Sequence, residues 1–431
     1  MTTHPTVPSM STRGTGAPDA EAAATAVLRE WFGHPGFRSG QAEIVAAMAE
    51  GRDVLAVLPT GAGKSICYQV PALMAGRPTL CVSPLIALMQ DQVDALRARE
   101  VPAAALTSAS SPEERRRALA LLEAREPALV YAAPERLETP AFLAAAVRAR
   151  LARVVVDEAH CISEWGHDFR PAYLEIGRFA RRVGRPPIAA FTATATPATR
   201  ADITERLGLR DPARFIAPVD RPNLRWEVRT PRRRPEAVSM IAAALRGRGD
   251  GAAVVYVPTR ALAAGMAAAL RRHGHGAIAY HAGLTADRRS RAQNAFLADR
   301  RGIVCATSAF GMGIDHPHVR LVAHLGMPGA LESYVQEAGR AGRDGQPARC
   351  LLVHLRGDER LHRRRIRELS RRARRGARAR LAAMRRYVHE RRCRRRAIAL
   401  YFGEPAPPCR GCDLCHGRRR AGQPEAIPGR R

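Results

Sequence analysis

The sequence predicts two tandem α/β domains with parallel sheets, followed by a small helical segment that carries a cysteine cluster. Short apolar runs alternate with Ala- and Leu-rich stretches of helical character, a second series of runs repeats this alternation, and the composition changes beyond Arg356. At 431 residues, the chain is long enough for two or three domains that each bury a core.

The apolar runs and the composition set the expected domains. The first series of runs lies at 54–58, 79–82, 154–156 and 188–191, and the second lies at 252–257, 278–280, 303–306, 319–323 and 350–353. The stretch 1–24 is rich in Thr, Pro, Ser, Gly and Ala without periodicity, which is typical of disorder. We expect a disordered N-terminus at 1–24, α/β domains at 25–218 and 219–356, an Arg-rich helical segment with the cysteine cluster at 357–415 and a disordered basic tail at 416–431.

The charge indicates a polyanionic partner. Lys plus Arg number 70 against 40 Asp plus Glu, so the formal net charge is +30, which favours nucleic acid, with a membrane surface as the competing explanation. No apolar run reaches the roughly 18 residues of a spanning helix, and the N-terminus lacks the pattern of a secretory signal. Nine cysteines suit a reducing compartment, so we expect a cytoplasmic protein that does not bind membranes.

A phosphate-binding loop follows the first apolar run. Pro-Thr-Gly-Ala-Gly-Lys-Ser at 59–65 precedes a helical stretch, and Lys64 is the only lysine in this basic chain. Small residues let backbone N–H groups wrap a phosphate, Lys64 can reach the terminal phosphates, and Ser65 can ligate Mg²⁺. Arginine supplies charge everywhere else, so position 64 requires the compact shape of lysine. Because Leu58 stands where the strict pattern has glycine, a chance Gly-rich turn is the alternative.

Two carboxylates follow the run at 154–156. Asp157 can hold Mg²⁺, and Glu158 can position or deprotonate an attacking water. A helix N-cap is the alternative, but beside a phosphate loop the pair favours ATP hydrolysis. In the second domain, Arg340 and Arg343 lie three residues apart among glycines, on one helical face or at the start of a helix, where they can approach and stabilise a γ-phosphate. Surface charge is the alternative for any single arginine.

The third segment combines cysteines with positive charge. Cys393, Cys409, Cys412 and Cys415 have the spacing of a tetrahedral Zn²⁺ site, with chance clustering as the alternative. Residues 360–396 contain 18 arginines and two acidic residues. We interpret them as helices that contact DNA phosphates in a salt-sensitive, sequence-independent way, rather than as a solvated charged face.

Together these motifs resemble the RecQ family of superfamily 2 DNA helicases over residues 28–415. The motifs that carry the resemblance are Leu28, Phe32-Gly33, Phe37-Arg38 and Gln41, then 57–65, 83–92, 157–160, 191–196, 280–284, 307–315 and 333–345. The resemblance implies RecA-like domains in which Arg38 and Gln41 recognise adenine, and Thr60, Gly61, Gly63, Lys64, Ser65 and Asp157 hold ATP with Mg²⁺. It also implies that Arg343 is the arginine finger and that Arg340 faces the phosphates.

The stretch 161–171 is the most specific to this family. It interleaves Trp165 and Phe169 with His167, Asp168 and Arg170, as base stacking and phosphate contact require. The resemblance implies that this loop senses single-stranded DNA and relays the contact to the ATPase site. Aromatic core residues are the alternative.

The resemblance implies an ATP-dependent 3′–5′ DNA helicase of recombination and repair. It would act on single-stranded and tailed or branched duplex DNA, as a nucleoid-associated monomer for which a single-strand-binding protein is a conceivable partner. The sequence stops 16 residues after Cys415, so we expect neither the winged helix nor the further helical (HRDC) domain of many RecQ proteins. Two rival functions stay open, an RNA-dependent ATPase or RNA helicase, and a DNA-binding or annealing protein that uses ATP as a switch.

Overall fold

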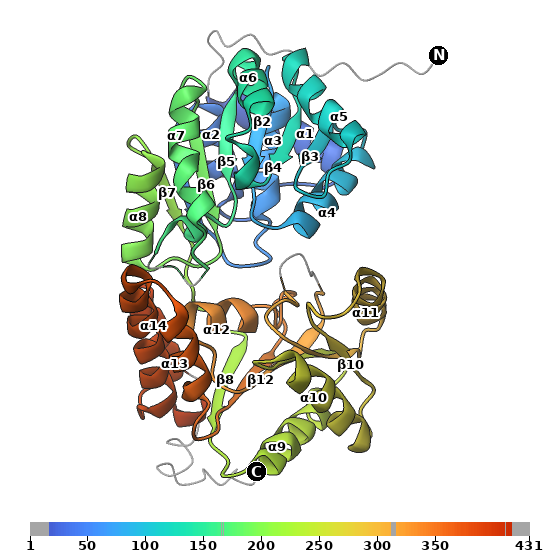
Figure 1. Ribbon diagram of the computed structural model, residues 1–431, viewed down its shortest axis with the longest axis vertical. Coiled ribbons are helices and arrows are strands. Elements are labelled where there is room, and N and C mark those ends of the chain that lie inside the picture. The colour runs from blue at the N-terminus through green and yellow to red at the C-terminus, as the bar shows by residue number, and fades with distance from the viewer. Residues whose placement is uncertain (1–16, 165, 167, 312–315, 410, 416–431) are drawn as a thin grey trace, which may run out of the picture. The chain divides into compact units, whose positions relative to one another are not determined.

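The computed structural model describes residues 17–164, 166, 168–311, 316–409 and 411–415 (Figure 1). The chain divides between Ala217 and Pro218 into two compact units, called unit 1 and unit 2 below. The expected basic tail at 416–431 and most of the expected N-terminal stretch lie outside the described residues.

Within the described residues of unit 1, seven parallel strands form sheet A in the order β3-β4-β2-β5-β6-β1-β7. The strands are β1 (Val54–Val57), β2 (Thr79–Val82), β3 (Ala103–Leu106), β4 (Leu129–Ala132), β5 (Arg153–Val156), β6 (Ile188–Thr192) and β7 (Ala213–Ile216). Nearly all of their side chains are buried, as expected for parallel strands that helices cover on both faces.

Two helix layers cover sheet A. The helices are α1 (Ala17–Phe32), α2 (Gln41–Ala49), α3 (Lys64–Met74), α4 (Ile86–Arg97), α5 (Pro112–Ala124), α6 (Pro140–Ala149), α7 (Ile176–Arg182) and α8 (Pro197–Leu207), with short 3-10 turns at Pro134–Arg136, Ala159–Ile162 and Pro171–Glu175. Leu55 and Val57 pack in one cluster with α5 to α8, whereas Val54 and Ala56 pack in another with α2 to α4. This alternation follows from the two-residue period of a strand.

In the described part of unit 2, six parallel strands form sheet B in the order β10-β11-β9-β12-β13-β8. The strands are β8 (Leu224–Arg229), β9 (Ala252–Tyr256), β10 (Ala277–Tyr280), β11 (Ile303–Ala306), β12 (Val319–Leu325) and β13 (Ala348–Val353). The helices are α9 (Arg234–Arg246), α10 (Arg260–Arg272), α11 (Ala286–Ala298), α12 (Leu331–Ala338), α13 (Glu359–Glu368), α14 (Arg371–His389) and α15 (Arg394–Tyr401). The predicted pair of parallel α/β sheets is therefore confirmed.

The Arg-rich third segment belongs to unit 2. Met384 and Tyr387 of α14 and Ile398 of α15 lie in the same hydrophobic cluster as Trp226 of β8 and Tyr334 of α12. The segment therefore shares the core of sheet B instead of burying a separate one.

Two sequence interpretations differ from the structure. The helix α1 begins at Ala17, inside the stretch expected to be disordered, and buried Ala24 and Leu28 pack with Val45 and Val70. Ala103–Leu106, part of an Ala- and Leu-rich stretch, forms strand β3 rather than helix. No helix among the described residues has both the length and the apolar character needed to cross a bilayer.

Buried Asp53 joins the amino ends of three neighbouring strands. Its carboxylate accepts hydrogen bonds from Arg185 Nη1 at 3.2 Å, from Ile188 N at 2.7 Å and from Arg210 N at 2.6 Å. Although burial opposes ionisation, the bond from Arg185 and the two backbone bonds hold the pKa of Asp53 below its ordinary value.

We predict that Asp53→Asn lowers the free energy of unfolding of unit 1 by about 3 kcal/mol at neutral pH, because it breaks a buried ion pair. A lowered native pKa stabilises the fold above the unfolded-state value, so the difference from wild type shrinks as the pH falls below about 4. Urea unfolding of both proteins between neutral and acid pH measures this difference in the free energy of unfolding. Asp94→Asn, at an exposed site on α4, is the control, and an equal loss at all pH values would contradict this explanation.

Candidate functional site

The loop 58–63 connects β1 to α3 and has the shape of a phosphate cradle. Gly61 and Gly63 have φ values of 88° and 77°, which favour glycine, and a Cβ on Gly63 would lie 2.4 Å from Gln41 Nε2. Lys64 is the first residue of α3, and its Nζ donates to Leu58 O at 3.5 Å, so the ammonium lies against the loop. Half-buried Thr60 and Ser65 flank this position, so the predicted loop residues come together at one helix N-terminus.

Arg38, three residues before α2, and Gln41, the first residue of α2, support the phosphate loop. Arg38 Nη1 donates to Gly61 O at 2.9 Å, and Gln41 Nε2 donates to Ala62 O at 3.0 Å and to Gly63 O at 3.2 Å. Gln41 Oε1 accepts from Arg38 N at 2.8 Å, which fixes the amide orientation. These side chains are therefore coupled directly to the backbone that would surround a phosphate.

Asp157 follows β5 at the same sheet edge as the phosphate loop, with only β6 between β5 and β1. Its side chain is buried, and Glu158 N donates to its Oδ1 at 3.0 Å. Burial, and then the neighbouring charge of Glu158, raise the pKa of Asp157, whereas Lys64 lowers it. Two adjacent buried carboxylates beside an ammonium fit a divalent cation held with a nucleotide phosphate.

Glu158 is held in a strained position by the residues that follow it. Its φ is 47°, in the left-handed region, and its Oε2 lies 3.2 Å from His160 Nδ1. The same nitrogen lies 2.9 Å from Thr192 Oγ1, at the end of β6. Glu158 is thereby connected through His160 to the 192–194 turn, in which Thr192 Oγ1 donates to Thr194 O at 3.3 Å.

The loop 161–171 is tied to the carboxylate site by side-chain contacts. Cys161 Sγ lies 3.9 Å from His160 Nε2 and 3.8 Å from Asp168 Oδ2. Arg170 Nε donates to Asp168 Oδ2 at 3.3 Å, and Arg170 Nη1 donates to Pro84 O at 2.7 Å. Gly166 allows a tight turn, since a Cβ there would lie 2.5 Å from His160 O.

The predicted DNA contacts of this loop fall partly outside the structure. Phe169 and Arg170 are half-buried, so Phe169 is not a fully buried core residue. Trp165 and His167 lie outside the described residues.

In unit 2, Arg340 and Arg343 lie in the turn after α12 rather than within a helix. Arg340 is buried, and Arg343 is half-buried. The Arg340 guanidinium packs closely against Gly311, since a Cβ at position 311 would lie 2.6 Å from Arg340 Nη2. A hydrogen bond links Arg340 to Tyr256, whose hydroxyl donates to Phe310 O at 2.7 Å. Burial raises the pKa of Tyr256 to about 12, so it stays a neutral donor.

Sequence reasoning did not assign the residues that hold this turn. Arg221 Nη1 donates to Gly339 O at 3.1 Å, and Asn223 Nδ2 donates to Gly342 O at 2.8 Å. Buried His324 pairs with Glu337 at 2.7 Å. Arg221 and Asn223 are more than 115 residues from the turn, and the only indication in the sequence is that both are polar residues just before β8.

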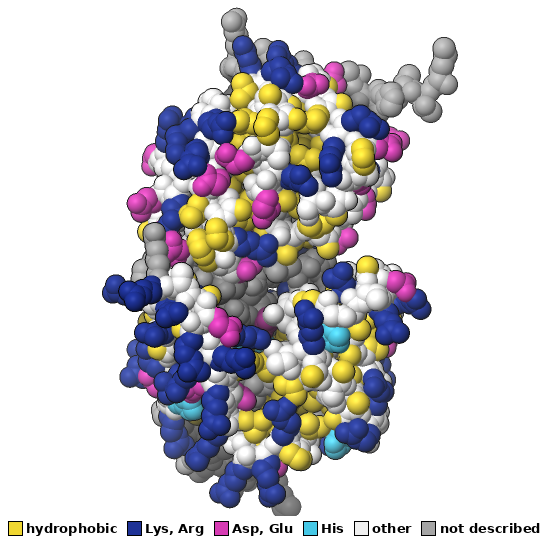
Figure 2. Space-filling view, viewed as in Figure 1, with side chains coloured by type: hydrophobic (Ala, Val, Ile, Leu, Met, Phe, Trp, Pro, Cys, Tyr) yellow, Lys and Arg dark blue, Asp and Glu magenta, His cyan; other side chains and the backbone are white. Residues whose placement is uncertain are grey.

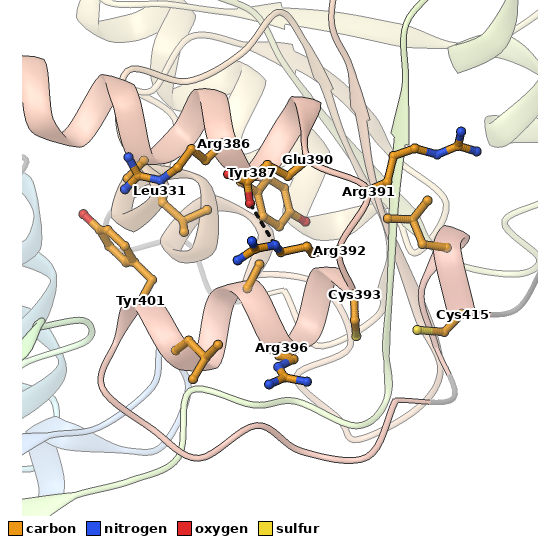
Figure 3. Close-up of a pocket in the computed structure, with 14 residues that line it drawn as sticks. Leu331, Arg386, Tyr387, Glu390, Arg391, Arg392, Cys393, Arg396, Tyr401 and Cys415 are labelled. Carbon is orange, nitrogen blue, oxygen red and sulfur yellow. Dashed lines mark ion pairs between the residues drawn. The ribbon is translucent and has the colours of Figure 1, made fainter.

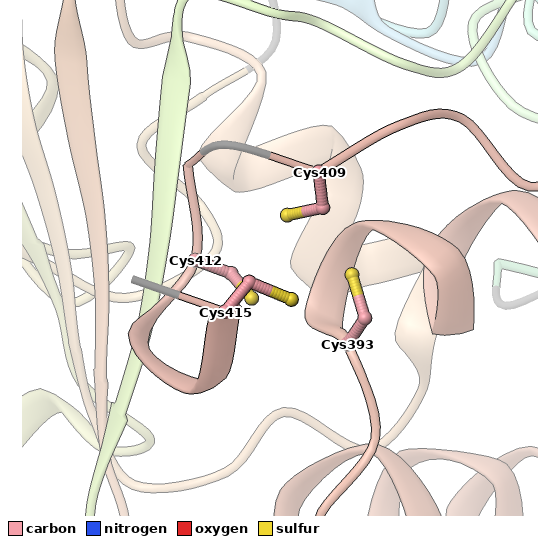
Figure 4. Close-up of side chains that lie close together, drawn as sticks. All are labelled: Cys393, Cys409, Cys412 and Cys415. Carbon is pink, nitrogen blue, oxygen red and sulfur yellow. The ribbon is translucent and has the colours of Figure 1, made fainter. Parts of the chain in front are cut away.

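The four predicted metal ligands come together. Cys393 caps the N-terminus of α15, and Cys409, Cys412 and Cys415 lie on the following loop, with all four Sγ atoms within 4.8 Å of one another (Figure 4). A tetrahedral Zn²⁺ with four thiolates at about 2.3 Å separates the sulfurs by about 3.8 Å, so a small contraction accommodates the ion. The donor set fits Zn²⁺.

The cysteine loop pairs with the edge of sheet B. Trp226 N donates to Gly411 O at 3.0 Å, and Val228 N donates to Asp413 Oδ2 at 3.0 Å. Asp413 also accepts from Arg394 Nε at 3.2 Å, with both side chains buried. The metal-binding loop is thereby anchored on β8.

A dense positive surface covers α13 and α14 (Figure 2). Beside it lies a pocket of 810 Å³ between α14, α15 and the cysteine loop (Figure 3), and its lining includes Tyr387 and Leu414. Its arginines are Arg386, Arg391, Arg392 and Arg396. By contrast, Arg394 and Arg395 are buried and pair with Asp413 and Asp220, so these two serve the fold.

Family models match most of the chain. They are the DEAD/DEAH box helicase model over residues 38–203, the helicase conserved C-terminal domain over 236–345 and the RecQ zinc-binding model over 356–416. Among solved structures, the DEAD-box helicase Mss116 bound to ssRNA and UDP-BeF has a TM-score of 0.64 at 17% identity, covering 89% of this chain and 88% of that one. The Mycobacterium smegmatis helicase Lhr bound to ssDNA and AMP-PNP has a TM-score of 0.59 at 22% identity, covering 76% and 47%. These structures show the shared fold.

Curated relatives are more similar in sequence. The ATP-dependent DNA helicase RecQ of Haemophilus influenzae is 39% identical over 91% of this chain and 63% of its own length, and that of Pasteurella multocida is 39% identical over 90% and 61%. The chain thus spans about three fifths of the length of these relatives. RecQ of Bacillus subtilis is 39% identical over 92% of this chain and 68% of its own length. With its phosphate loop, its Asp-Glu pair and its four-cysteine cluster, the chain belongs to the RecQ family.

Proposed function

We propose that this protein is an ATP-dependent DNA helicase that moves 3′ to 5′ on single-stranded DNA and unwinds tailed or branched duplexes in recombination and repair. The observation that carries the proposal is the cradle of Lys64 beside the buried Asp157–Glu158 pair in unit 1. A glycine-flanked arginine turn in unit 2 would supply the complementary cation. The relatives named ATP-dependent DNA helicase RecQ support DNA as the polymer.

Each residue of unit 1 has a role that its contacts support. The phosphate loop and the N–H groups at the start of α3 would bind the triphosphate, and Lys64 would hold its terminal phosphates. Ser65 and Asp157 would hold Mg²⁺, while Glu158 orients a water and accepts its proton at a carboxylate oxygen beside His160. Bound ATP with Mg²⁺ supplies the phosphoanhydride bond that is hydrolysed.

The arginines of unit 2 would complete the reaction. In our proposal Arg343 is the arginine finger that stabilises charge on the γ-phosphate, and Arg340 faces the phosphates from beside Tyr256. The network of Arg221 and Asn223 keeps the turn in shape before the nucleotide binds. Opening and closing around ATP would then move the two units stepwise along one strand.

The loop 161–171 would couple DNA to this chemistry. Trp165 and Phe169 would stack on bases, with His167 and Arg170 beside phosphates. The path from Arg170 through Asp168 and Cys161 to His160 ends at Glu158, so a shift of the loop reaches the residue that orients water.

We propose DNA contact for the positive surface as well. The exposed arginines of α13 and α14, together with those of the pocket in Figure 3, would bind phosphates without base specificity. The protein would act as a monomer associated with the nucleoid in the cytoplasm.

Strand displacement tests the proposed function directly. We predict that the protein unwinds a 3′-tailed DNA duplex with ATP and Mg²⁺, and that Lys64→Arg lowers ATP hydrolysis and unwinding by about 10²–10³-fold, because guanidinium does not fit the cradle. The control is Arg77→Lys, the reverse substitution at an exposed position, which should leave both activities unchanged. Stimulation by RNA alone would favour an RNA helicase, and DNA binding without displacement would favour an annealing protein.

A second prediction concerns the sensing loop. Loss of one stacking partner costs about 1–3 kcal/mol per base, so Trp165→Ala raises the DNA concentration for half-maximal ATPase stimulation roughly tenfold. The DNA-free ATPase rate should fall much less, and steady-state phosphate release with increasing oligonucleotide measures both. Equal losses with and without DNA would assign Trp165 to the fold instead.

A third prediction concerns the arginines of the pocket. Removing two phosphate contacts lowers the slope of log affinity against log salt by about 1.4, at roughly 0.7 per contact on single strands. Arg386→Gln with Arg396→Gln should show this change in fluorescence anisotropy across a salt series. Arg116→Gln with Arg117→Gln on α5 removes the same charge from exposed positions, and an identical slope change there would attribute the effect to net charge.

A further inference from the structure

Two histidines and a glutamate meet where the Arg-rich helices join sheet B. His354 directly follows β13, Glu359 begins α13, and His389 ends α14. Each offers one ligand atom, and these atoms all lie within 4.8 Å of one another. The two imidazole rings have centroids 5.3 Å apart at an interplanar angle of 79°, and His389 Nε2 lies 3.6 Å from Glu359 Oε1.

One of these groups is buried beside a carboxylate. The side chain of His354 is 3% exposed, and its Nδ1 lies 3.3 Å from Asp358 Oδ2. That carboxylate oxygen already accepts from Leu355 N at 2.8 Å. A carboxylate beside one nitrogen of a metal-binding imidazole orients the ring, so Asp358 favours a ligand role for His354. The backbone of His354 is fixed, because its N–H donates to Arg229 O at 2.8 Å.

The charges around the cluster set how tightly it could hold a cation. Arg363 Nη2 lies 2.8 Å and Arg385 Nε lies 2.9 Å from the Glu359 carboxylate, whose side chain is 14% exposed. These two guanidinium groups hold the Glu359 carboxylate in place beside His389. The same arginines repel a divalent ion, so we expect this site to bind a divalent ion more weakly than the four cysteines do.

We propose that His354, Glu359 and His389 form a second metal site, which binds a divalent transition-metal ion of the Zn²⁺ type with water completing its coordination. Neutral imidazoles and one carboxylate are ligands that zinc accepts, and three protein ligands leave a position open to water. The ion joins the end of β13 to the start of α13 and the end of α14. It therefore fastens α13 and α14 to sheet B, independently of the four cysteines and of the proposed helicase activity.

Zinc stoichiometry tests this proposal on the full chain. We expect protein dialysed against micromolar free Zn²⁺ to retain two zinc ions per chain by elemental analysis, one on the cysteines and one on the second site. Among the described residues, the other five cysteines are all buried and belong neither to the four-cysteine cluster nor to the second site, so they do not account for a second ion. His389→Gln, which replaces a half-exposed side chain, should retain one ion and lose the rise in melting temperature that added zinc gives wild type.

Two further variants make the outcome decisive. His354→Gln should also retain one ion, whereas His34→Gln, which removes an exposed histidine of unit 1, should retain two. Circular dichroism confirms that each variant is folded. One ion in wild type, or two ions in His389→Gln and His354→Gln alike, would overturn the second site.

Discussion

The chemistry of unit 1 depends on one constraint, that parallel strands deliver their carboxyl ends to a single edge of the sheet. With β6 between β1 and β5, the phosphate loop, the 192–194 turn and Asp157 reach that edge together. Thr192 then meets His160, and His160 meets Glu158. The strand order alone therefore brings residues that are more than 120 positions apart in the chain into one site.

Arginine performs several distinct tasks in this basic protein. Arg170 ties the loop 161–171 to Pro84, Arg221 shapes the turn that carries Arg340 and Arg343, and buried Arg394 anchors the cysteine loop. The arginines of α13 and α14 are mostly exposed and make the charged surface. The count of 70 Lys and Arg residues therefore overstates the number of cations available to a polyanion, since buried arginines such as Arg394 and Arg395 pair with carboxylates inside the fold.

The features that sequence analysis found are those whose chemistry is local. The phosphate loop, the Asp157–Glu158 pair and the spacing of the cysteines each lie within a short stretch, and apolar runs marked most strands of the confirmed sheets. Strand β3 was missed because Ala103, Ala104 and Ala105 lack the β-branched side chains typical of strands, and burial beside α4 and α5 determines their conformation. Similarly, α1 is stabilised by its contact with Val45 and Val70, which composition alone does not reveal. The support of the arginine turn by Arg221 and Asn223 arises from contacts distant in sequence, beyond the reach of motifs.

The pairing of the cysteine loop with β8 has a consequence for solubility. β8 is the last strand of sheet B, and its outward N–H groups at Trp226 and Val228 are bonded to Gly411 and Asp413. An open strand edge is a template for joining another chain. Thiolate ligation keeps the cysteine loop in place, and the loop therefore also protects the edge of β8 from pairing with another chain. A protein stripped of its zinc would be prone to self-association by strand addition before it unfolds.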